Sequence, residues 1–434
     1  MSISLEALRP CLDGAVPAVI ATTAPDGVPN VAFLSQVHYV DSAHVALSFQ
    51  FFSKTRENIL AHPYATVQLI EPASFRHFRL RLHYLRTETA GPLFEYMKAQ
   101  LAGIAAQSHL EGVFHLRGAD IYEVVAIEAV DPEQRAPQAP ADTLLRLRRA
   151  LEQLDRADDL AQVADQALAA LAAGFGIHHA LLLMLDETGA ALYTLASLGY
   201  PDSGVGAEVA VGEGIIGVAA RERIPVRINH RTSDYRYQAA ARATDAAESR
   251  IPLPVLANPH SQIAVPLVHA GRVYGVLYAE SEQDAYFGHA DEDALVVYGR
   301  HLAALVAQAA CDSDEAAPAV VPAAPPAARG TPLAVRYFPA DHSVFIDNDY
   351  LIKGVAGSIL WTLLSEFAAS GRRDFCNREL RRDPRLPLPD VGDNLETRLI
   401  LLARRLAERC PAIALDKTGR GRFRLRVERP LQLG

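Results

Sequence analysis

Residues 260–281, HSQIAVPLVHAGRVYGVLYAES, hold two strand-like runs, Ile263–Leu267 and Val273–Ala279. Both are short apolar runs without a helical period, which is typical of strands. The segment Ser261–Leu267 has the continuous apolar character of a strand buried on both faces. It is therefore predicted to be the central strand of a covered sheet.

The residues around this pair extend the pattern. Further strand-like runs lie at Ala180–Asp186 and Ala190–Ser197. A helix is predicted from about Asp142, and another over Glu292–Ala310 closes the segment. The order of helix, strands and helix predicts an α+β sandwich over residues 141–312.

The first of these helices carries leucines at heptad spacing. Leu144, Leu147, Leu151 and Leu154 lie on one side, and the pattern ends at Asp158. Two heptads are too few for a long coiled coil. The stripe predicts either a core-facing helix or a short dimer seam.

Two proline-rich joints divide the chain. Residues 316–328, AAPAVVPAAPPAA, contain only Ala, Pro and Val and predict a semi-rigid linker over 313–332. The stretch DPEQRAPQAP at 131–140 predicts a second joint. The predicted domains are residues 1–130, 141–312 and 333–434.

The charge is unevenly distributed over the 434 residues. The formal net charge of −9 argues against a protein that coats nucleic acid over its whole surface. From Leu333 onward, however, 18 Lys and Arg outnumber 13 Asp and Glu. A basic C-terminal domain on an acidic body predicts an anionic partner for that domain.

Four separated cysteines, Cys11, Cys311, Cys376 and Cys410, predict reduced thiols and neither a disulfide framework nor a cysteine-based metal site. The N-terminal residues have no long apolar run, so no signal peptide is expected. Residues 166–185 lack charge, but two glycines interrupt them, which predicts a helix end, a turn and a buried strand. We therefore expect a cytoplasmic protein without a membrane segment.

Residues 1–130 are predicted to be rich in strands, which indicates a small barrel. In Phe75–Tyr84, apolar and polar side chains alternate, as in a strand with one buried face. A helix is predicted over Leu93–Ala106. The other predicted strands are Ala18–Thr23, Val31–His38, His44–Phe49 and Thr66–Ile70.

Two stretches of this segment resemble a known family. VIATTAPDGVPNVAF (19–33) and HVALSFQFFSKTRENILAHPYATVQL (44–69) are similar to the pyridoxamine 5'-phosphate oxidase-like split barrels that bind FMN. Around Lys54, hydroxyl groups and the N–H groups of a helix start are suited to a flavin phosphate. The resemblance implies FMN, and also a homodimer with the flavin at the two-fold interface. The cofactor-binding residues it implies are Ser48, Phe49, Gln50, Phe51, Ser53, Lys54, Thr55, Asn58 and Gln68.

Two alternatives remain for the first segment. Its histidines, including His77 and His83, allow a haem ligand, since haem-binding split barrels exist. An FMN-dependent oxidoreductase is the other alternative, although no catalytic residue and no metal ligand can be assigned. Lys54 and its neighbours are also compatible with a solvated helix start.

The middle segment resembles GAF domains. The similarity rests on VAVGEGIIGVAARERIPVRI (209–228), on residues 260–281 and on FGHADEDAL (287–295). It implies a sensor or a dimerisation module, with an unknown small molecule as a possible ligand. Glu280 and Ser281 stand about where the Asn-Lys pair of cyclic-nucleotide-binding GAF domains is expected, which argues against that ligand.

The C-terminal segment resembles the winged-helix domains of response regulators. An N-terminal hairpin, helices, and the hairpin IALDKTGRGRFRLRV (413–427) follow in the order of that family. In the predicted helix Asp393–Arg409, leucines at i, i+4, i+7 and i+11 form a core stripe, and the residues off that stripe are available for DNA. The DNA-binding residues predicted on the helix and the wing are Thr397, Arg398, Arg404, Arg405, Arg420 and Arg422.

The apolar residues Ile400, Leu401 and Ala403 also lie off the core stripe, which instead favours a protein interface. Together the segments predict a multidomain α+β protein: a split β-barrel, a GAF sandwich and a winged helix. The predicted function is a one-component transcriptional regulator that binds a flavin and DNA. The rivals are an oxidoreductase with accessory domains, and a haem sensor whose winged helix recruits protein.

Overall fold

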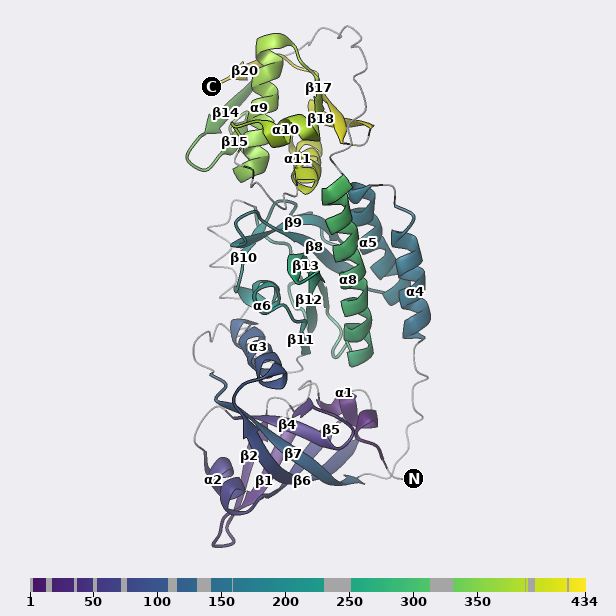
Figure 1. The fold of residues 1–434 in the computed structure, drawn as a ribbon, viewed down its shortest axis with the longest axis vertical. Helices are drawn as coiled ribbons and strands as arrows, with labels where there is room; N and C mark the ends of the chain where they lie inside the picture. Colours follow the sequence, from purple (N-terminus) through teal and green to yellow (C-terminus); the bar gives the residue numbers. More distant parts are fainter. Residues whose placement is uncertain are drawn as a thin grey trace.

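The computed structural model describes residues 3–12, 18–34, 37–49, 53–71, 76–107, 115–130, 142–157, 159–229, 251–312, 331–386, 388, 395–419 and 421–434. These residues form three parts arranged along the long axis of the molecule, with the middle part between the other two (Figure 1). Most of each predicted joint lies outside the described residues, at 131–141 and 313–330.

The N-terminal part is a curled antiparallel sheet with strand order β2-β1-β5-β6-β7-β4-β3 (Figure 1). Its strands are β1 (Ala18–Thr23), β2 (Pro29–Leu34), β3 (Val37–Tyr39), β4 (His44–Phe49), β5 (Tyr64–Ile70), β6 (His77–Glu88) and β7 (Gly118–Ala129). Its helical segments are η1 (Glu6–Leu8), α1 (Arg9–Leu12), α2 (Lys54–Ala61) and α3 (Pro92–Gln107).

Alternation decides which face of β6 enters the core. Phe78, Leu80 and Leu82 are buried, and the residues between them are partly or fully exposed. The alternation predicted for this strand is therefore confirmed, although the strand begins later and runs further. Strand β7, which the sequence analysis did not predict, pairs with β6 along most of its length.

The middle part is an antiparallel sheet with strand order β10-β9-β8-β13-β12-β11. Its strands are β8 (His179–Leu185), β9 (Ala191–Leu198), β10 (Glu208–Ala210), β11 (Val226–Asn229), β12 (Ser261–His269) and β13 (Arg272–Ser281). Its helices are α4 (Thr143–Leu154), α5 (Leu160–Phe175), α6 (Gly214–Glu222) and α8 (His289–Asp312).

Helices cover both faces of this sheet. Ile263 and Val265 of β12 pack in the apolar cluster formed with α4, α5 and α8, whereas Ala264 packs in the cluster formed with α6. Because successive side chains of a strand point to opposite faces, a strand covered on both sides is apolar throughout. The prediction of a buried strand here is confirmed.

The uncharged stretch 166–185 is also as predicted. Helix α5 is capped at its start by Asp159, whose carboxylate accepts a hydrogen bond from the Gln162 N–H at 2.9 Å. It ends at Phe175, where Gly176 is the C-cap, and β8 follows. Among the described residues, no helix combines the length and apolar character of a membrane span.

The heptad leucines of α4 divide between core and solvent. Leu147 and Leu154 are buried in the main apolar cluster, and Leu151 packs against it. Leu144 is exposed. The stripe therefore serves mainly as the core face of α4.

The C-terminal part has two small sheets, with strand orders β16-β15-β14-β20 and β17-β19-β18. Its strands are β14 (Leu333–Phe338), β15 (Ser343–Ile346), β16 (Asp349–Ile352), β17 (Asp374–Cys376), β18 (Ile413–Gly419), β19 (Arg422–Val427) and β20 (Leu431–Leu433). Its helices are α9 (Gly354–Ser370), α10 (Asn377–Arg382) and α11 (Leu395–Arg409).

Helix α11 presents one apolar stripe to its own domain. Leu395, Leu399, Leu402 and Leu406 are all buried, which confirms the predicted core stripe. Helix α11 packs against α9, β16 and β18 of the C-terminal part and also against α5, α8 and β9 of the middle part. Its apolar cluster is continuous with that of the middle part.

Candidate functional site

The start of α2 holds the polar groups that the sequence predicted for a phosphate. Ser53 is the N-cap, and its hydroxyl accepts from the Arg56 N–H at 3.4 Å. Lys54 is exposed at the first helical position, and Thr55 accepts a hydrogen bond from the Asn30 amide at 2.9 Å. An exposed ammonium beside helix N–H groups suits an anionic group.

Arg56, by contrast, is engaged inside the domain. Its guanidinium lies 3.8 Å from the centre of the Phe49 ring and pairs with the carboxylate of Asp120. It also donates to the Thr87 hydroxyl at 3.2 Å. Phe49, Thr87 and Asp120 lie on β4, β6 and β7, so Arg56 ties α2 to these three strands. Both members of the ion pair are largely buried.

The remaining predicted flavin contacts are divided between two faces of the sheet. Asn58 is fully buried and donates to the Thr22 hydroxyl at 3.1 Å, so its amide serves the buried face of the N-terminal sheet. Gln68 lies on the opposite face of the neighbouring strand, where its amide is 2.9 Å from His77 Nδ1. Ser48 is half-buried on β4. The predicted contacts Gln50 and Phe51 lie outside the described residues.

The histidines of the N-terminal domain have separate environments. Burial lowers the pKa of His38 to about 4, and its ring meets the edge of Tyr96 on α3. His44 pairs with Asp41, and His77 with Gln68. Over the described ranges, no cluster of three or more His, Cys, Asp or Glu side chains could hold a metal ion.

The sequence GEGIIG, residues 212–217, forms a turn that leads into α6, which begins at Gly214. A Cβ atom at Gly217 would lie 2.2 Å from the Ala210 carbonyl oxygen, so only glycine lets α6 approach β10 this closely. The turn therefore sets the distance between α6 and the sheet.

A buried carboxylate on the α6 side of the sheet was not anticipated from the sequence. Glu280 accepts hydrogen bonds from the hydroxyls of Tyr200 and Tyr278, at 2.9 and 2.7 Å, and from the Leu256 N–H at 2.6 Å. Burial and the adjacent Glu280 raise the pKa of Tyr200. This network satisfies the carboxylate without a cation among the described residues.

The predicted DNA-contacting side chains of α11 face the middle domain. Thr397 is fully buried, and its hydroxyl accepts from the Tyr193 hydroxyl at 2.8 Å. The Arg398 guanidinium lies 3.9 Å from the centre of the Tyr193 ring and pairs with Glu187. Burial alone would lower the pKa of Arg398, but Tyr193 and Glu187 outweigh it and raise the pKa above its ordinary value.

Arg404 and Arg405 are engaged as well. Arg404 donates to the Leu195 carbonyl at 2.8 Å and to Asp165 at 2.6 Å. Arg405 is buried and donates to the Leu351 carbonyl of β16 at 3.1 Å. Thr397, Arg398 and Arg404 therefore contact the middle domain, and Arg405 contacts β16 of its own domain, so this structure does not place these side chains on an outward face.

The predicted wing is the hairpin of β18 and β19. Arg422 begins β19 and is half-buried, whereas Arg420 lies outside the described residues. Further along β19, Arg424 pairs with Asp374 at 2.8 Å, and Arg426 pairs with Asp416 at 3.0 Å. The basic side chains of the hairpin are thus partly balanced by carboxylates.

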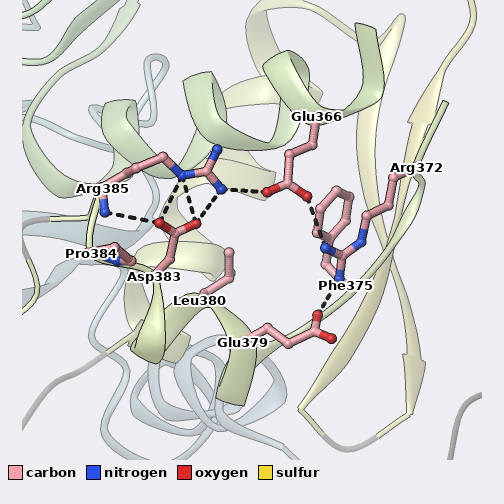
Figure 2. Close-up of a pocket in the computed structure, with 8 residues that line it drawn as sticks. All are labelled: Glu366, Arg372, Phe375, Glu379, Leu380, Asp383, Pro384 and Arg385. Atoms are coloured by element: carbon pink, nitrogen blue, oxygen red, sulfur yellow. Dashed lines mark hydrogen bonds and ion pairs between the residues drawn. The ribbon is translucent and has the colours of Figure 1, made fainter. Parts of the chain in front are cut away.

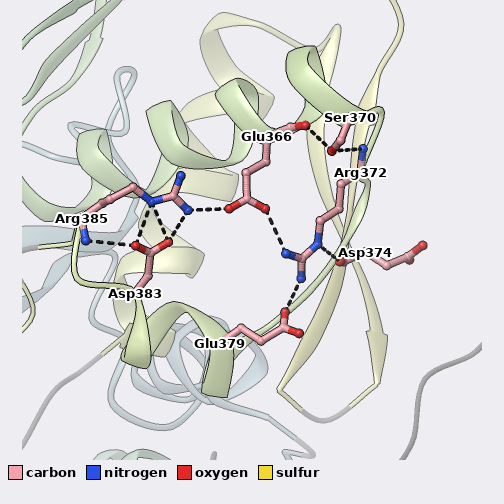
Figure 3. Close-up of polar contacts among 7 residues, drawn as sticks. All are labelled: Glu366, Ser370, Arg372, Asp374, Glu379, Asp383 and Arg385. Carbon is pink, nitrogen blue, oxygen red and sulfur yellow. Dashed lines mark hydrogen bonds and ion pairs between the residues drawn. The ribbon is translucent and has the colours of Figure 1, made fainter.

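A pocket of about 400 Å³ opens in the C-terminal domain between α9, β17 and α10 (Figure 2). Arg372 pairs there with Glu366 at 3.0 Å and with Glu379, and its guanidinium lies over the Phe375 ring. Arg385 pairs with Glu366 and Asp383, as Figure 3 shows. These charges satisfy one another, so the network clamps α10 against α9.

Comparisons with known proteins identify the middle domain. Residues 157–307 match the GAF domain family. None of the curated proteins matches the chain. The middle domain is therefore a GAF domain, which confirms what the sequence resemblance implied for this segment.

Three solved structures show similarity to parts of the chain. The GAF domain of a phosphoenolpyruvate-protein phosphotransferase from Acinetobacter is 24% identical, with a TM-score of 0.32, and covers 39% of this chain and 96% of that one. An FMN-binding protein from Syntrophomonas wolfei subsp. wolfei is 14% identical (TM-score 0.25; 30% and 88% covered). HupZ from Group A Streptococcus is 17% identical (TM-score 0.24; 31% and 100% covered).

Proposed function

We propose that this chain is a signal-responsive regulator in which the GAF domain couples an N-terminal flavin-binding split barrel to a C-terminal DNA-binding winged helix. The observation that carries the proposal is the position of the GAF domain, which packs against α3 of the barrel at α6 and against α11 at α5 and β9. A domain in contact with both neighbours can transmit a change between them.

The flavin part of the proposal rests on the resemblance of residues 44–69 and on the start of α2. Ser53, Lys54 and Thr55 gather there, and Lys54 is the exposed cation. They would hold the flavin phosphate, and Gln68 on the outer face of β5 would meet the ring edge. Asn58 and Arg56 are not part of the proposed flavin site, because Asn58 is buried against Thr22 and Arg56 is paired with Asp120.

Absorbance of the purified chain tests this part. Flavin bands are expected, and Lys54→Gln is expected to weaken FMN binding by about tenfold or more, because a charge-assisted hydrogen bond is lost. Lys98→Gln is the matched control, since Lys98 is an exposed lysine of the same domain that pairs with Glu95. A Soret band would indicate haem as the cofactor instead of FMN, and a colourless protein would contradict both cofactor assignments.

The proposed homodimer is supported by exposed apolar side chains near α2. Val31 and Phe33 project from the edge strand β2, and Leu60 of α2 is exposed as well. Such a patch on a small domain is typical of a protein interface. Light scattering is expected to give a dimer, and Phe33→Asp to give a monomer.

The DNA-binding part is tested with a labelled 30-base-pair duplex from the region upstream of the chain's own gene. Anisotropy is expected to report binding that weakens steeply between about 50 and 200 mM salt, because each phosphate contact releases counterions. Arg422→Ala is expected to reduce the salt slope by about one. No binding at the lower salt concentration would contradict this part of the proposal.

A further inference from the structure

The face of α11 that covers the GAF domain forms a second helical stripe. Thr397, Leu401, Arg404 and Glu408 are spaced i, i+4, i+7 and i+11, which places them on one side of the helix. Each has a defined environment. Thr397 bonds Tyr193, Leu401 is buried in the apolar cluster shared by both domains, and Glu408 accepts from Ser203 at 2.6 Å.

The cations of this face meet carboxylates of the GAF domain. Arg398 pairs with Glu187, and Arg404 pairs with Asp165 at 2.6 Å. Both acids lie more than 200 positions away in the sequence. The GAF domain thus presents negative oxygens to the side chains that the sequence predicts for DNA phosphates.

The contact continues on both sides of α11. Lys417 of β18 pairs with Asp159 at the start of α5, at 2.8 Å. Burial would raise the pKa of Asp159, but Lys417 and the Gln162 N–H hold it below its ordinary value. Lys353, just before α9, pairs with Glu208 of β10 at 2.7 Å. Basic groups of three C-terminal elements therefore face acidic groups of the GAF domain.

Strand β9 links this contact to the interior of the GAF domain. Strand β9 lies between β8 and β10 in the sheet. Its residues Tyr193 and Leu195 pack in the apolar cluster that includes α11, whereas Leu192 packs in the cluster on the α6 side of the sheet. A change on the α6 side that shifts β9 would therefore reach Arg398 and Arg404 directly.

We infer that α11 is an autoinhibited DNA-binding surface: docking on the GAF domain and contact with a duplex are mutually exclusive. The inference rests on the proposed DNA-binding function. A guanidinium that is paired with Glu187 and stacked on a buried ring cannot also reach a phosphate. DNA binding would then require release of the C-terminal domain, and the apparent affinity is reduced by the fraction of molecules that are released.

The test uses the full chain and changes only the GAF side of the contact. Glu187→Gln combined with Asp165→Asn removes both carboxylates and leaves α11 intact, and Tyr193→Ala removes the stacked ring. Each variant is expected to bind the 30-base-pair duplex at least about tenfold more tightly than the wild type. An increased radius of gyration in small-angle scattering would accompany release.

The matched control is Glu152→Gln with Glu95→Gln, which removes two exposed carboxylates that pair with cations of their own helices and changes the net charge equally. Its duplex affinity is expected to stay within about twofold of the wild type, as distant exposed charges are screened. Equal duplex affinity in the wild type and both release variants would overturn the inference while leaving DNA binding intact. Absence of binding in every variant at low salt would overturn DNA binding and, with it, the inference.

Discussion

The GAF domain contacts its two neighbours in different ways. Toward the N-terminal domain the contact is steric and mostly uncharged: α3 packs on α6, and Gln100 donates to the Pro225 carbonyl at 2.8 Å. Toward the C-terminal domain it combines a shared apolar cluster with ion pairs, such as those of Arg398 and Arg404. A shape-matched contact resists salt, whereas a charged contact can be displaced by a competing polyanion. The difference assigns the reversible step to the C-terminal side.

Among changes to the charged contact, replacement of Arg398 is expected to weaken the docking of the C-terminal domain most. Its side chain is 12% exposed and that of Glu187 is 26% exposed, so solvent screens the pair only partly. Arg398→Ala leaves Glu187 without its partner and is expected to weaken docking by about 2–3 kcal/mol. Energy transfer between dyes on α4 and α10 would report the loss.

Arg148→Ala is the control for Arg398→Ala. Arg148 forms an exposed pair with Glu152 one turn along α4, so its loss should leave the energy transfer unchanged. If both variants behaved alike, the contact of α11 with the GAF domain would not depend on its charges.

The stability of the N-terminal domain should depend on pH instead. The pKa of His38 is lowered from 6.5 to about 4, so the folded N-terminal domain keeps the ring neutral while the unfolded chain takes up a proton below pH 6.5. Stability is therefore lost as the pH falls from about 6.5 to about 4, by roughly 2 kcal/mol at pH 5. Because the ring of His38 contacts Tyr96 of α3, we expect its protonation also to disturb the helix that packs on the GAF domain.

Hydrogen exchange of the β4 amides at pH 7 and pH 5 would measure this loss, after correction for the intrinsic exchange rate. His38→Phe is expected to remove most of the pH dependence, whereas His44→Gln, at a partly exposed histidine paired with Asp41, is not. An unchanged pH profile in His38→Phe would assign the acid sensitivity to another group.

A side chain at Gly103 of α3 is expected to weaken the steric contact between the N-terminal domain and the GAF domain. A Cβ atom there would lie 2.4 Å from Val226 Cγ1, and Val226 is fully buried and β-branched. Gly103→Ala is expected to destabilise the barrel–GAF contact by about 1.5 kcal/mol, as measured by thermal unfolding. Val226→Ala in the same chain should recover part of the loss, because it removes the clashing methyl group.

Gly174→Ala provides the control for Gly103→Ala. Gly174 lies inside α5, and a Cβ atom there would meet nothing closer than the Arg146 carbonyl at 3.6 Å. Since alanine favours a helix interior, this variant should be neutral or slightly stabilising. A comparable loss in both glycine variants would contradict the steric account.

The smallest effect is expected at the edge of the charged contact. Lys353 and Glu208 are each about two-fifths exposed. Lys353→Gln should therefore weaken docking by less than about 0.5 kcal/mol, as is usual for exposed pairs. A larger effect in the same energy-transfer measurement would shift the centre of the contact away from Arg398.

Much of the secondary structure could be predicted because burial repeats with the period of the element. The buried strand over Ser261–Leu267 and the leucine stripe of α11 are both found where the pattern placed them. Strand β7 was missed, although it pairs with both β6 and β4. Its first residues are buried without alternation, so they lack the period that identifies a half-buried strand.

The predicted site residues of the barrel were only partly brought together. Ser53, Lys54 and Thr55 are adjacent in sequence, and the helix start holds them together. Asn58 of α2 reaches Thr22 on the buried face of the sheet, whereas Gln68 of β5 lies on the other face, and the packing of α2 on the sheet, not sequence distance, decides this. The partner of Arg56, Asp120, comes from the unpredicted strand β7, so this ion pair could not be anticipated.

By itself the sequence determined the GAF domain, through its resemblance to that family, and which residues of α11 form its core stripe, through a short periodicity. It did not determine what covers the other face of α11. Helical periodicity separates core residues from the rest, but polar side chains look the same whether they face water, DNA or another domain. Only the tertiary structure, which brings Glu187 and Asp165 to Arg398 and Arg404, decided that the GAF domain occupies that face.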